Sequence, residues 1–237
     1  MAELTENIVP PVPDATPSLP FETEELRRQL EIFLNSSWTD PASGQQMKLG
    51  NYKCGIYAFY DYDNEPIYVG QTKEKISTRI RRHLTNQRTD AVAMSVLDPY
   101  EVCYIEVWPI SDLQHSSAAA TKEKLDALEY EAYRLLLKNS RFNAVLNEKE
   151  PLVPPSRCKL PASFKIKVVS DEVSRLRDHP DLRIARRALT LSRLAKVIAE
   201  RKVQKGLRKT LLTQAERLVD LAKRRVLSIP NTEDEED

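Results

Sequence analysis

Residues 54–84 constrain the fold more than any other stretch, because they read in order as strand, turn, strand and helix. The run 54–60 is rich in aromatic and β-branched residues, and 67–69 is a second short apolar run. Between them, residues 61–66 are almost all turn formers. The sequence therefore predicts a β-hairpin that leads through a short loop into a helix.

Two tyrosines of this hairpin are predicted to share one face. If the turn is centred near Tyr62 and Asp63, Tyr57 and Tyr68 lie opposite one another, with Cβ atoms about 5 Å apart. Gly70 follows and leaves room for a backbone or a ligand to come close. In the helix, Arg79 and His83 are one turn apart, so both can be aimed at the two phenols. The alternative is an ordinary cross-strand aromatic pair beside a solvated basic helix face.

The composition is that of a globular chain with a charged exterior. Of the 237 residues, 41% are hydrophobic and 30% are charged, yet the net charge is only +1, so any basic region must be offset elsewhere. Cys54, Cys103 and Cys158 are odd in number and far apart, which favours structural thiols in a reducing, cytoplasmic setting over disulfides or a zinc site. No apolar run approaches the roughly 20 residues that span a bilayer, so no membrane partner is predicted.

By composition the chain divides into five segments. Residues 1–20 are rich in proline and acidic residues and are predicted to be a disordered leader. Residues 21–150 are predicted to form one domain that begins with an amphipathic helix. A proline-rich linker, 151–163, separates this domain from a basic helical appendage, 164–228, and residues 229–237 form an acidic tail.

The strongest helical pattern of the first two thirds lies at residues 121–138. Glu131 follows Leu128 by three residues and precedes Leu135 by four, which places it in the apolar face, whereas Glu129 is expected to point nearly the opposite way. A carboxylate on the core side is costly unless a metal ion or an arginine compensates for its desolvation. Two interpretations remain: Glu131 belongs to a polar site, or it lies at the helix margin and reaches water.

The segment from Arg183 to Val226 holds fourteen Lys or Arg residues against three acidic ones. Its apolar residues recur at helical spacing, which predicts a helical hairpin. Such a basic surface suits the phosphate backbone of DNA, and Arg186, Arg187 and Arg193 are predicted as contacts. The competing interpretation is a solvated surface or a dimer contact.

Taken in order, the candidate residues resemble the GIY-YIG nuclease domain. The resemblance covers roughly residues 52–148. Its elements are Gly55-Ile56-Tyr57, Tyr68-Val69-Gly70 after ten intervening residues, Arg79 and His83 four apart, and Glu131 and Asn143 twelve apart. Two tripeptides alone are a weak signal, but five matched elements in the right order are much more specific. The sequence departs from the family at Val69, where isoleucine is commonest, and at Gln71, where many relatives carry lysine.

The resemblance implies a small α/β (α+β) domain in which helices flank a three-stranded antiparallel sheet. It also implies hydrolysis of phosphodiester bonds with one divalent cation, Mg²⁺ or Mn²⁺. Glu131 is then the ligand of the metal. Arg79 clamps the phosphate, because a forked guanidinium does so better than an ammonium.

The remaining catalytic roles follow from the same resemblance and from the residue types. Tyr57 is expected to orient and deprotonate the attacking water, although its ordinary pKa near 10 requires cationic help or onward proton transfer. His83 is the expected recipient of that proton or an electrostatic partner of the phenol. Tyr68 is expected to position water or phosphate, and Asn143 to hydrogen-bond to a tyrosine or to the scissile phosphate.

The implied partner is DNA, contacted also through Gly70, Gln71 and Arg82. The layout of an N-terminal extension, a nuclease core and a further C-terminal segment is closest to the restriction-endonuclease branch of the family. For that branch, a companion methyltransferase and, at a palindromic site, a homodimer are the expected partners. A repair or recombination nuclease is the alternative enzyme, and a nucleic-acid-binding module that lost catalysis is the alternative outside the enzyme class.

Overall fold

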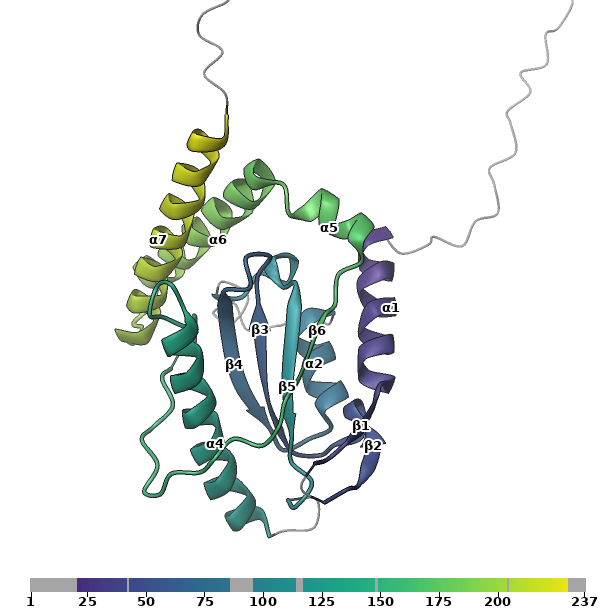
Figure 1. Cartoon of the computed structure of the whole chain (residues 1–237). Coiled ribbons are helices and arrows are strands. Elements are labelled where there is room, and N and C mark those ends of the chain that lie inside the picture. Colours follow the sequence, from purple (N-terminus) through teal and green to yellow (C-terminus); the bar gives the residue numbers. More distant parts are fainter. Residues whose placement is uncertain are drawn as a thin grey trace, which may run out of the picture.

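The structure is a computed structural model that describes residues 21–41, 43–85, 96–113, 117–147, 149–203 and 205–229. Its centre is an antiparallel sheet in the order β4-β3-β5-β6 (Figure 1). The four strands are β3 Gly55–Tyr60, β4 Pro66–Thr72, β5 Tyr104–Pro109 and β6 Phe164–Lys167. The predicted fold class is confirmed, and β6 extends the sheet from three strands to four.

Two helices cover opposite faces of the sheet (Figure 1). α2, Ile76–Leu84, packs on the face that carries Tyr57. α4, Ala118–Asn139, packs on the face that carries Ile56. Successive residues of a strand point to opposite faces, so β3 contributes alternate residues to two separate cores and is buried along its whole length.

The hairpin of β3 and β4 forms, but not in the predicted register. Tyr57 pairs with Gly70, and Phe59 pairs with Tyr68. Tyr57 and Tyr68 are therefore diagonal neighbours on one face, and the prediction that they lie directly opposite one another is wrong. The connecting loop is longer than a two-residue turn and the pairing is irregular beside it, which shifts the register.

One aspartate shapes this loop, residues 61–65. Asp61 Oδ1 accepts hydrogen bonds from the backbone N–H groups of Asp63, at 2.9 Å, and Glu65, at 3.0 Å. Asn64 adopts a left-handed backbone with φ of 60°, which asparagine tolerates better than most residues. The loop is thus held by its own polar groups, as the composition of the break suggested.

The remaining elements flank this central sheet. Before it come α1 Phe21–Asn35, β1 Ser37–Thr39, β2 Gln46–Lys48 and a short 3₁₀ helix Leu49–Asn51. A second 3₁₀ helix, Pro99–Glu101, precedes β5, and the C-terminal third holds α5 Asp171–Arg177, α6 Pro180–Glu200 and α7 Lys205–Ser228. The predicted leader, residues 1–20, and residues 230–237 of the predicted tail lie outside the described residues.

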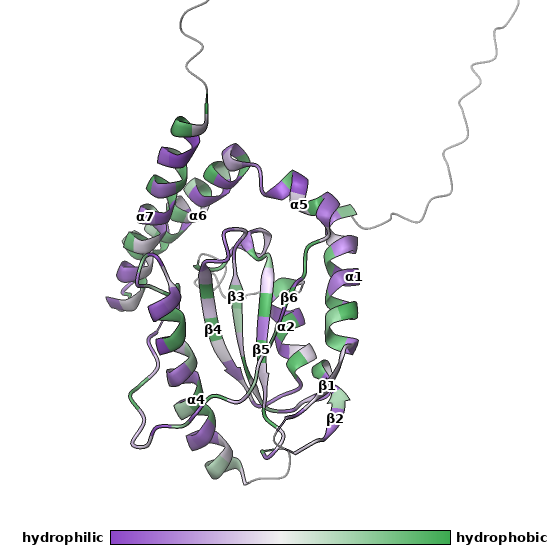
Figure 2. Cartoon of the chain, in the orientation of Figure 1, coloured by the Kyte–Doolittle hydropathy of each residue, from purple (hydrophilic) through white to green (hydrophobic). Residues whose placement is uncertain are grey.

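The C-terminal helices share the core of the sheet. α6 and α7 pair with one another, and apolar residues alternate with polar ones along both (Figure 2). Leu194, Ile198 and Leu207 are buried in the same hydrophobic cluster as Tyr57 and the apolar face of α2. The segment predicted as an appendage therefore packs as part of one body with the hairpin.

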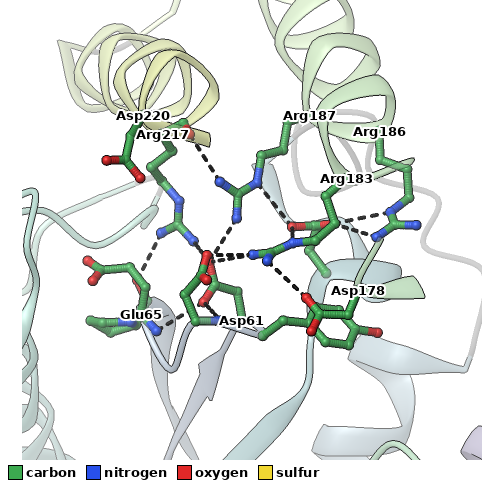
Figure 3. Close-up of polar contacts among 12 residues, drawn as sticks. Asp61, Glu65, Asp178, Arg183, Arg186, Arg187, Arg217 and Asp220 are labelled. Carbon is green, nitrogen blue, oxygen red and sulfur yellow. Dashed lines mark hydrogen bonds and ion pairs between the residues drawn. The ribbon is translucent and has the colours of Figure 1, made fainter. Parts of the chain in front are cut away.

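A buried ionic network joins α6 and α7 to the hairpin loop (Figure 3). We call it the Asp61 cluster, and it consists of Asp61, Glu101, Arg183, Arg187 and Arg217. Asp61 Oδ2 accepts hydrogen bonds from Arg187 Nη2, at 2.9 Å, and Arg217 Nη2, at 2.6 Å, and lies 3.5 Å from Arg183 Nη2. Arg187 also donates to Glu101, and Arg217 donates to the carbonyl of Pro66 at the start of β4. No side chain of the cluster is more than a tenth exposed.

The cluster corrects two of the predicted DNA contacts. Arg187 is 4% exposed and bound to two carboxylates, so its guanidinium is not accessible to a DNA backbone. Arg186 is bound to Glu101, at 2.8 Å, and to the carbonyl of Arg177. Both residues face the body of the protein because they compensate acidic groups of the hairpin loop and of the 3₁₀ helix Pro99–Glu101.

The structure describes all three cysteines. Cys54, Cys103 and Cys158 are all free, and the first two are buried. Within the described ranges, no helix is long and apolar enough to cross a membrane.

The Asp61 cluster gives a stability prediction. Asp61→Asn keeps the size of the side chain but leaves three buried guanidiniums without their shared charge, which should lower the free energy of unfolding by about 3–5 kcal/mol. Urea unfolding followed by circular dichroism measures this change. Asp171→Asn, which removes an exposed carboxylate paired with Lys167, is the control and should unfold near the wild-type midpoint. Equal unfolding of the two variants would show that the cluster does not hold the helices.

Candidate active site

The Tyr57 hydroxyl is the centre of a polar cluster on the α2 face of the sheet. Its oxygen lies 2.7 Å from His83 Nε2 and accepts a hydrogen bond from Arg79 Nε at 3.1 Å. The ring of Tyr68 is 6.1 Å from that of Tyr57 and 5.3 Å from that of His83, between centroids. The structure thus brings four predicted site residues together, because Arg79 and His83 are one turn apart on α2 and that turn faces the hairpin.

Tyr57 is buried, although its predicted role was to contact and deprotonate the attacking water. Its side chain has no solvent exposure, whereas Tyr68 and Arg79 are partly exposed. Burial holds the pKa of Tyr57 well above its ordinary value, Tyr68 adds to the rise, and the charge of Arg79 opposes it. The phenol is therefore protonated at neutral pH, and the prediction that it contacts and deprotonates water directly does not fit this geometry.

Gly70 is explained by Tyr57 and not by a ligand. A Cβ at position 70 would lie 2.6 Å from the Tyr57 hydroxyl and 3.0 Å from the Tyr68 ring. Only glycine leaves space for the phenol beneath β4. The predicted close approach therefore exists, but a side chain of the protein makes it, and Gly70 itself is buried.

A second polar group lies on the other face of β4. Gln71 is the next residue along the strand, so its side chain points toward α4. Gln71 Nε2 donates to Asp126 Oδ1, at 2.6 Å, and to Glu129 Oε2, at 3.0 Å. These bonds engage the amide of Gln71, which the sequence had suggested as a DNA contact, with two carboxylates of α4.

Glu129 is a carboxylate of α4 that contacts β4, through Gln71. Burial raises its pKa to about 7, and the charge of Asp126 contributes to the rise. The hydrogen bond from Gln71 and the charge of Arg79 act in the opposite direction, so Glu129 lies within electrostatic reach of Arg79. Because β4 is the edge strand, Glu129 on one face and the phenols on the other border the same edge.

Glu131, the predicted metal ligand, is held elsewhere. Arg157 donates to it through Nε, at 2.7 Å, and Nη2, at 3.1 Å. The described residues show no contact between Glu131 and either Arg79 or the phenols, so the structure does not bring it together with them. At about 100° per residue, Glu129 lies about 60° from the middle of the buried stripe of α4 and Glu131 about 100° from it on the other side. Only the side of α4 that carries Glu129 faces β4.

The predicted asparagine, Asn143, lies apart from the tyrosines, and a different asparagine, Asn147, contacts β4. Asn143 is exposed, with a left-handed φ of 48° in the turn after α4, and makes no contact with the tyrosines within the described ranges. Asn147, which the sequence analysis missed, accepts from Val69 N, at 3.1 Å, and donates to Val69 O, at 2.8 Å. Its amide thus satisfies the free edge of β4 between Tyr68 and Gly70, as a neighbouring strand would.

Weak signals for the missed residues are present in the sequence. Asp126 and Glu129 are three apart and so share one flank of α4. Nothing local, however, shows that this flank meets Gln71, or that Asn147 reaches Val69. Of the other predicted contacts, Arg82 is exposed and paired with Glu74 at 2.7 Å.

The oxygen atoms beside β4 fit a hard divalent cation. They comprise the carboxylates of Asp126 and Glu129 and the amide oxygen of Gln71, which is buried and has no hydrogen-bond partner within the described residues. Mg²⁺ prefers such donors and usually keeps several waters. In the part of the chain that the structure describes, no group of three or more His, Cys, Asp or Glu side chains could hold a metal. Water and substrate would therefore complete the shell.

Comparison with known proteins identifies the domain. Residues 53–143 match the GIY-YIG catalytic domain, a segment that holds Tyr57, Tyr68, Arg79 and His83 and also Glu129, Glu131 and Asn143. The chain therefore contains a GIY-YIG catalytic domain, which confirms the resemblance seen in the sequence. At the family level this is a nuclease domain. No curated protein and no solved structure matches the chain.

The raised pKa of Glu129 gives a second stability prediction. A carboxyl whose pKa is about 7 when folded and 4.5 ordinarily favours folding below about pH 4.5, and this contribution is lost as the pH rises through 7. Without metal, Glu129→Gln should therefore raise the melting temperature at pH 8 and have little effect at pH 4.5. Thermal melts in a chelating buffer measure the difference. Glu131→Gln, which loses its bonds to Arg157, should show no such gain, and a gain equal to that of Glu129→Gln would contradict the assignment.

Proposed function

We propose that the protein is a divalent-metal-dependent endonuclease that hydrolyses DNA phosphodiester bonds. The observation that carries the proposal is the Tyr57 hydroxyl, held between Arg79 and His83, with the buried Glu129 carboxylate across the same edge strand. A phosphodiester at this edge would meet a cation, a proton relay and a carboxylate together. These are the groups that in-line hydrolysis requires.

Arg79 is the proposed phosphate clamp. Its Nε–H donates to Tyr57, and within the described residues its terminal nitrogens have no hydrogen bond. These N–H groups can therefore donate to a phosphate without disturbing the phenol. The clamp is preorganised, because the bond to Tyr57 and the packing of α2 already fix the guanidinium.

Tyr57 and His83 form the proposed proton path. The N–H of Arg79 is always a donor, so the phenol oxygen accepts from it, and the phenol can donate its own proton to His83 Nε2. Tyr68 is partly exposed and covers this pair, so it is the phenol that can orient water or phosphate. Tyr57 then acts through its neighbours as a buried relay and not as a base in contact with water.

Glu129, supported by Asp126 and Gln71, is the proposed ligand group for Mg²⁺ or Mn²⁺. When bound, the ion would neutralise the charge that develops on the phosphate oxygens and assist the leaving oxygen. Glu129 must give up its proton to serve this role. Its pKa of about 7 allows that near neutral pH.

Restriction or another defence role is the biological setting that we propose, with repair or recombination as the second candidate. The support is the arrangement of one nuclease core between an N-terminal helix and a helical pair. A homodimer and a companion methyltransferase belong to the same proposal. A binding module without catalysis is disfavoured, because the clamp, the relay and the carboxylate are all present.

Plasmid cleavage tests the activity. Purified wild type should cut with Mg²⁺ and not with chelator. Tyr57→Phe should slow cutting about 10²–10⁴-fold, since the ring stays but the relay is lost. Tyr100→Phe, an exposed tyrosine in the 3₁₀ helix before β5, is the control and should cut normally. Discrete fragments would indicate restriction, a smear would indicate a structure-directed nuclease, and binding by all forms without cutting would leave only the module.

A matched pair of variants tests the choice of carboxylate. Glu129→Gln should abolish cutting, and Glu131→Gln should leave it near the wild-type rate, because only the first removes an oxygen ligand at the β4 edge. Initial rates at several Mg²⁺ concentrations measure this. If Glu131→Gln were inactive and Glu129→Gln active, Glu131 would be the metal ligand, as the sequence predicted.

The pKa of Glu129 predicts how cutting depends on pH. At subsaturating Mg²⁺ the rate should rise through about pH 7 as the carboxyl ionises. More Mg²⁺ should move the midpoint to lower pH, because the ion binds the ionised form. Rates from pH 5.5 to 8.5 at two Mg²⁺ concentrations measure the shift. If the pH midpoint of the rate is the same at both Mg²⁺ concentrations, Glu129 is not a ligand of the ion.

A further inference from the structure

Two groups can be distinguished among the fourteen basic residues between Arg183 and Val226. The inward group, Arg183, Arg186, Arg187 and Arg217, is bound to carboxylates of the body. A second group surrounds the connection between the helices. We call it the basic tip, and it consists of Arg201, Lys202, Lys205 and Arg208.

The basic tip differs from the inward group in exposure and pairing. All four of its side chains are exposed, and none forms an ion pair with another residue of the described ranges. The acidic groups that lie near are already engaged, because Glu200 pairs with Lys196 and Glu150 with Lys209. Four cations within eight residues therefore face solvent without compensation, in a chain whose net charge is only +1.

Hydrogen bonds place this tip beside the catalytic strand. Thr210, in the second turn of α7, donates to the carbonyl of Asn147 at 3.2 Å. The side chain of Asn147 in turn holds both backbone groups of Val69, between Tyr68 and Gly70. Lys205 is five residues before Thr210, about 7.5 Å along the helix axis. A single residue thus separates the first turns of α7 from the edge of β4.

We infer that the basic tip is a second contact for the phosphate backbone of DNA, adjacent to the site at the edge of β4. The inference rests on the proposed function and replaces Arg186 and Arg187 as the DNA contacts of the C-terminal helices. Arg193, which is exposed on α6, stays a predicted contact. Unpaired Lys and Arg residues near a phosphodiester site bind neighbouring phosphates and release their counterions, independently of base sequence.

Salt dependence distinguishes this role from general charge. Binding to a 30-base-pair duplex of arbitrary sequence is measured in chelator, so that no recognition site is needed and no cutting occurs. The tip variant changes all four residues to Gln. The control variant changes Arg27, Lys122, Arg175 and Lys223 to Gln, which are exposed on other surfaces and without an ion pair in the described ranges, so both variants have the same net charge.

Four lost phosphate contacts lower the slope of log Kd against log salt by about 3.6. Between 50 and 200 mM salt, the wild type should therefore lose about 150-fold more affinity than the tip variant. The control should keep the wild-type slope, and melting temperatures should agree because all the changed side chains are exposed.

Each outcome bears on one proposal. A wild-type slope in the tip variant, or equal losses in both variants, would overturn the inference, as would tip-dependent self-association without an effect on DNA. Plasmid cutting by the wild type would still stand in those cases. Conversely, a tip-dependent slope in a protein that never cuts would keep the tip as a DNA contact and remove the nuclease proposal.

Discussion

Asp61 is the residue on which the arrangement of the molecule depends. One of its oxygens fixes the loop between β3 and β4, and the other receives Arg187 and Arg217 from α6 and α7. Buried charges are tolerated only where their partners are complete, so the loop and the helices stabilise one another. The C-terminal third is consequently a part of the nuclease body that fixes the turn of the catalytic hairpin.

The edge position of β4 explains how side chains from both faces of the sheet can border one candidate site. Alternate side chains of an edge strand face two layers, so Tyr68 joins the α2 layer while Gln71 joins α4. A substrate strand at this edge would meet both layers, which a central strand could not offer. Asn147 covers the backbone groups of Val69, and this satisfies an edge that would otherwise invite pairing with another chain.

The basic residues of the C-terminal third differ in their surroundings: some are buried in ion pairs, and others are exposed. Arginines that face the sheet are bonded to Asp61 and Glu101, and they account for part of the basic composition of α6 and α7. Four of the other cations, Arg201, Lys202, Lys205 and Arg208, surround the connection between α6 and α7. A count of basic residues cannot make this distinction, because it depends on which side of each helix is buried. Arg187 and Arg208 look alike in the sequence and have opposite surroundings.

Local patterns in the sequence determined much of this protein. Aromatic and β-branched runs around a polar break define the hairpin, apolar spacing defines the helices, and the order of Tyr57, Tyr68, Arg79 and His83 identifies the family. These features follow from neighbours within one strand or one helix turn. Only the tertiary structure decided that Glu129 faces Gln71 of β4 while Glu131 faces Arg157, because the two lie at opposite margins of one buried stripe and the rotation of α4 on the sheet selects between them. It also decided that Arg187 is buried, since its partner Asp61 lies 126 residues away in the chain.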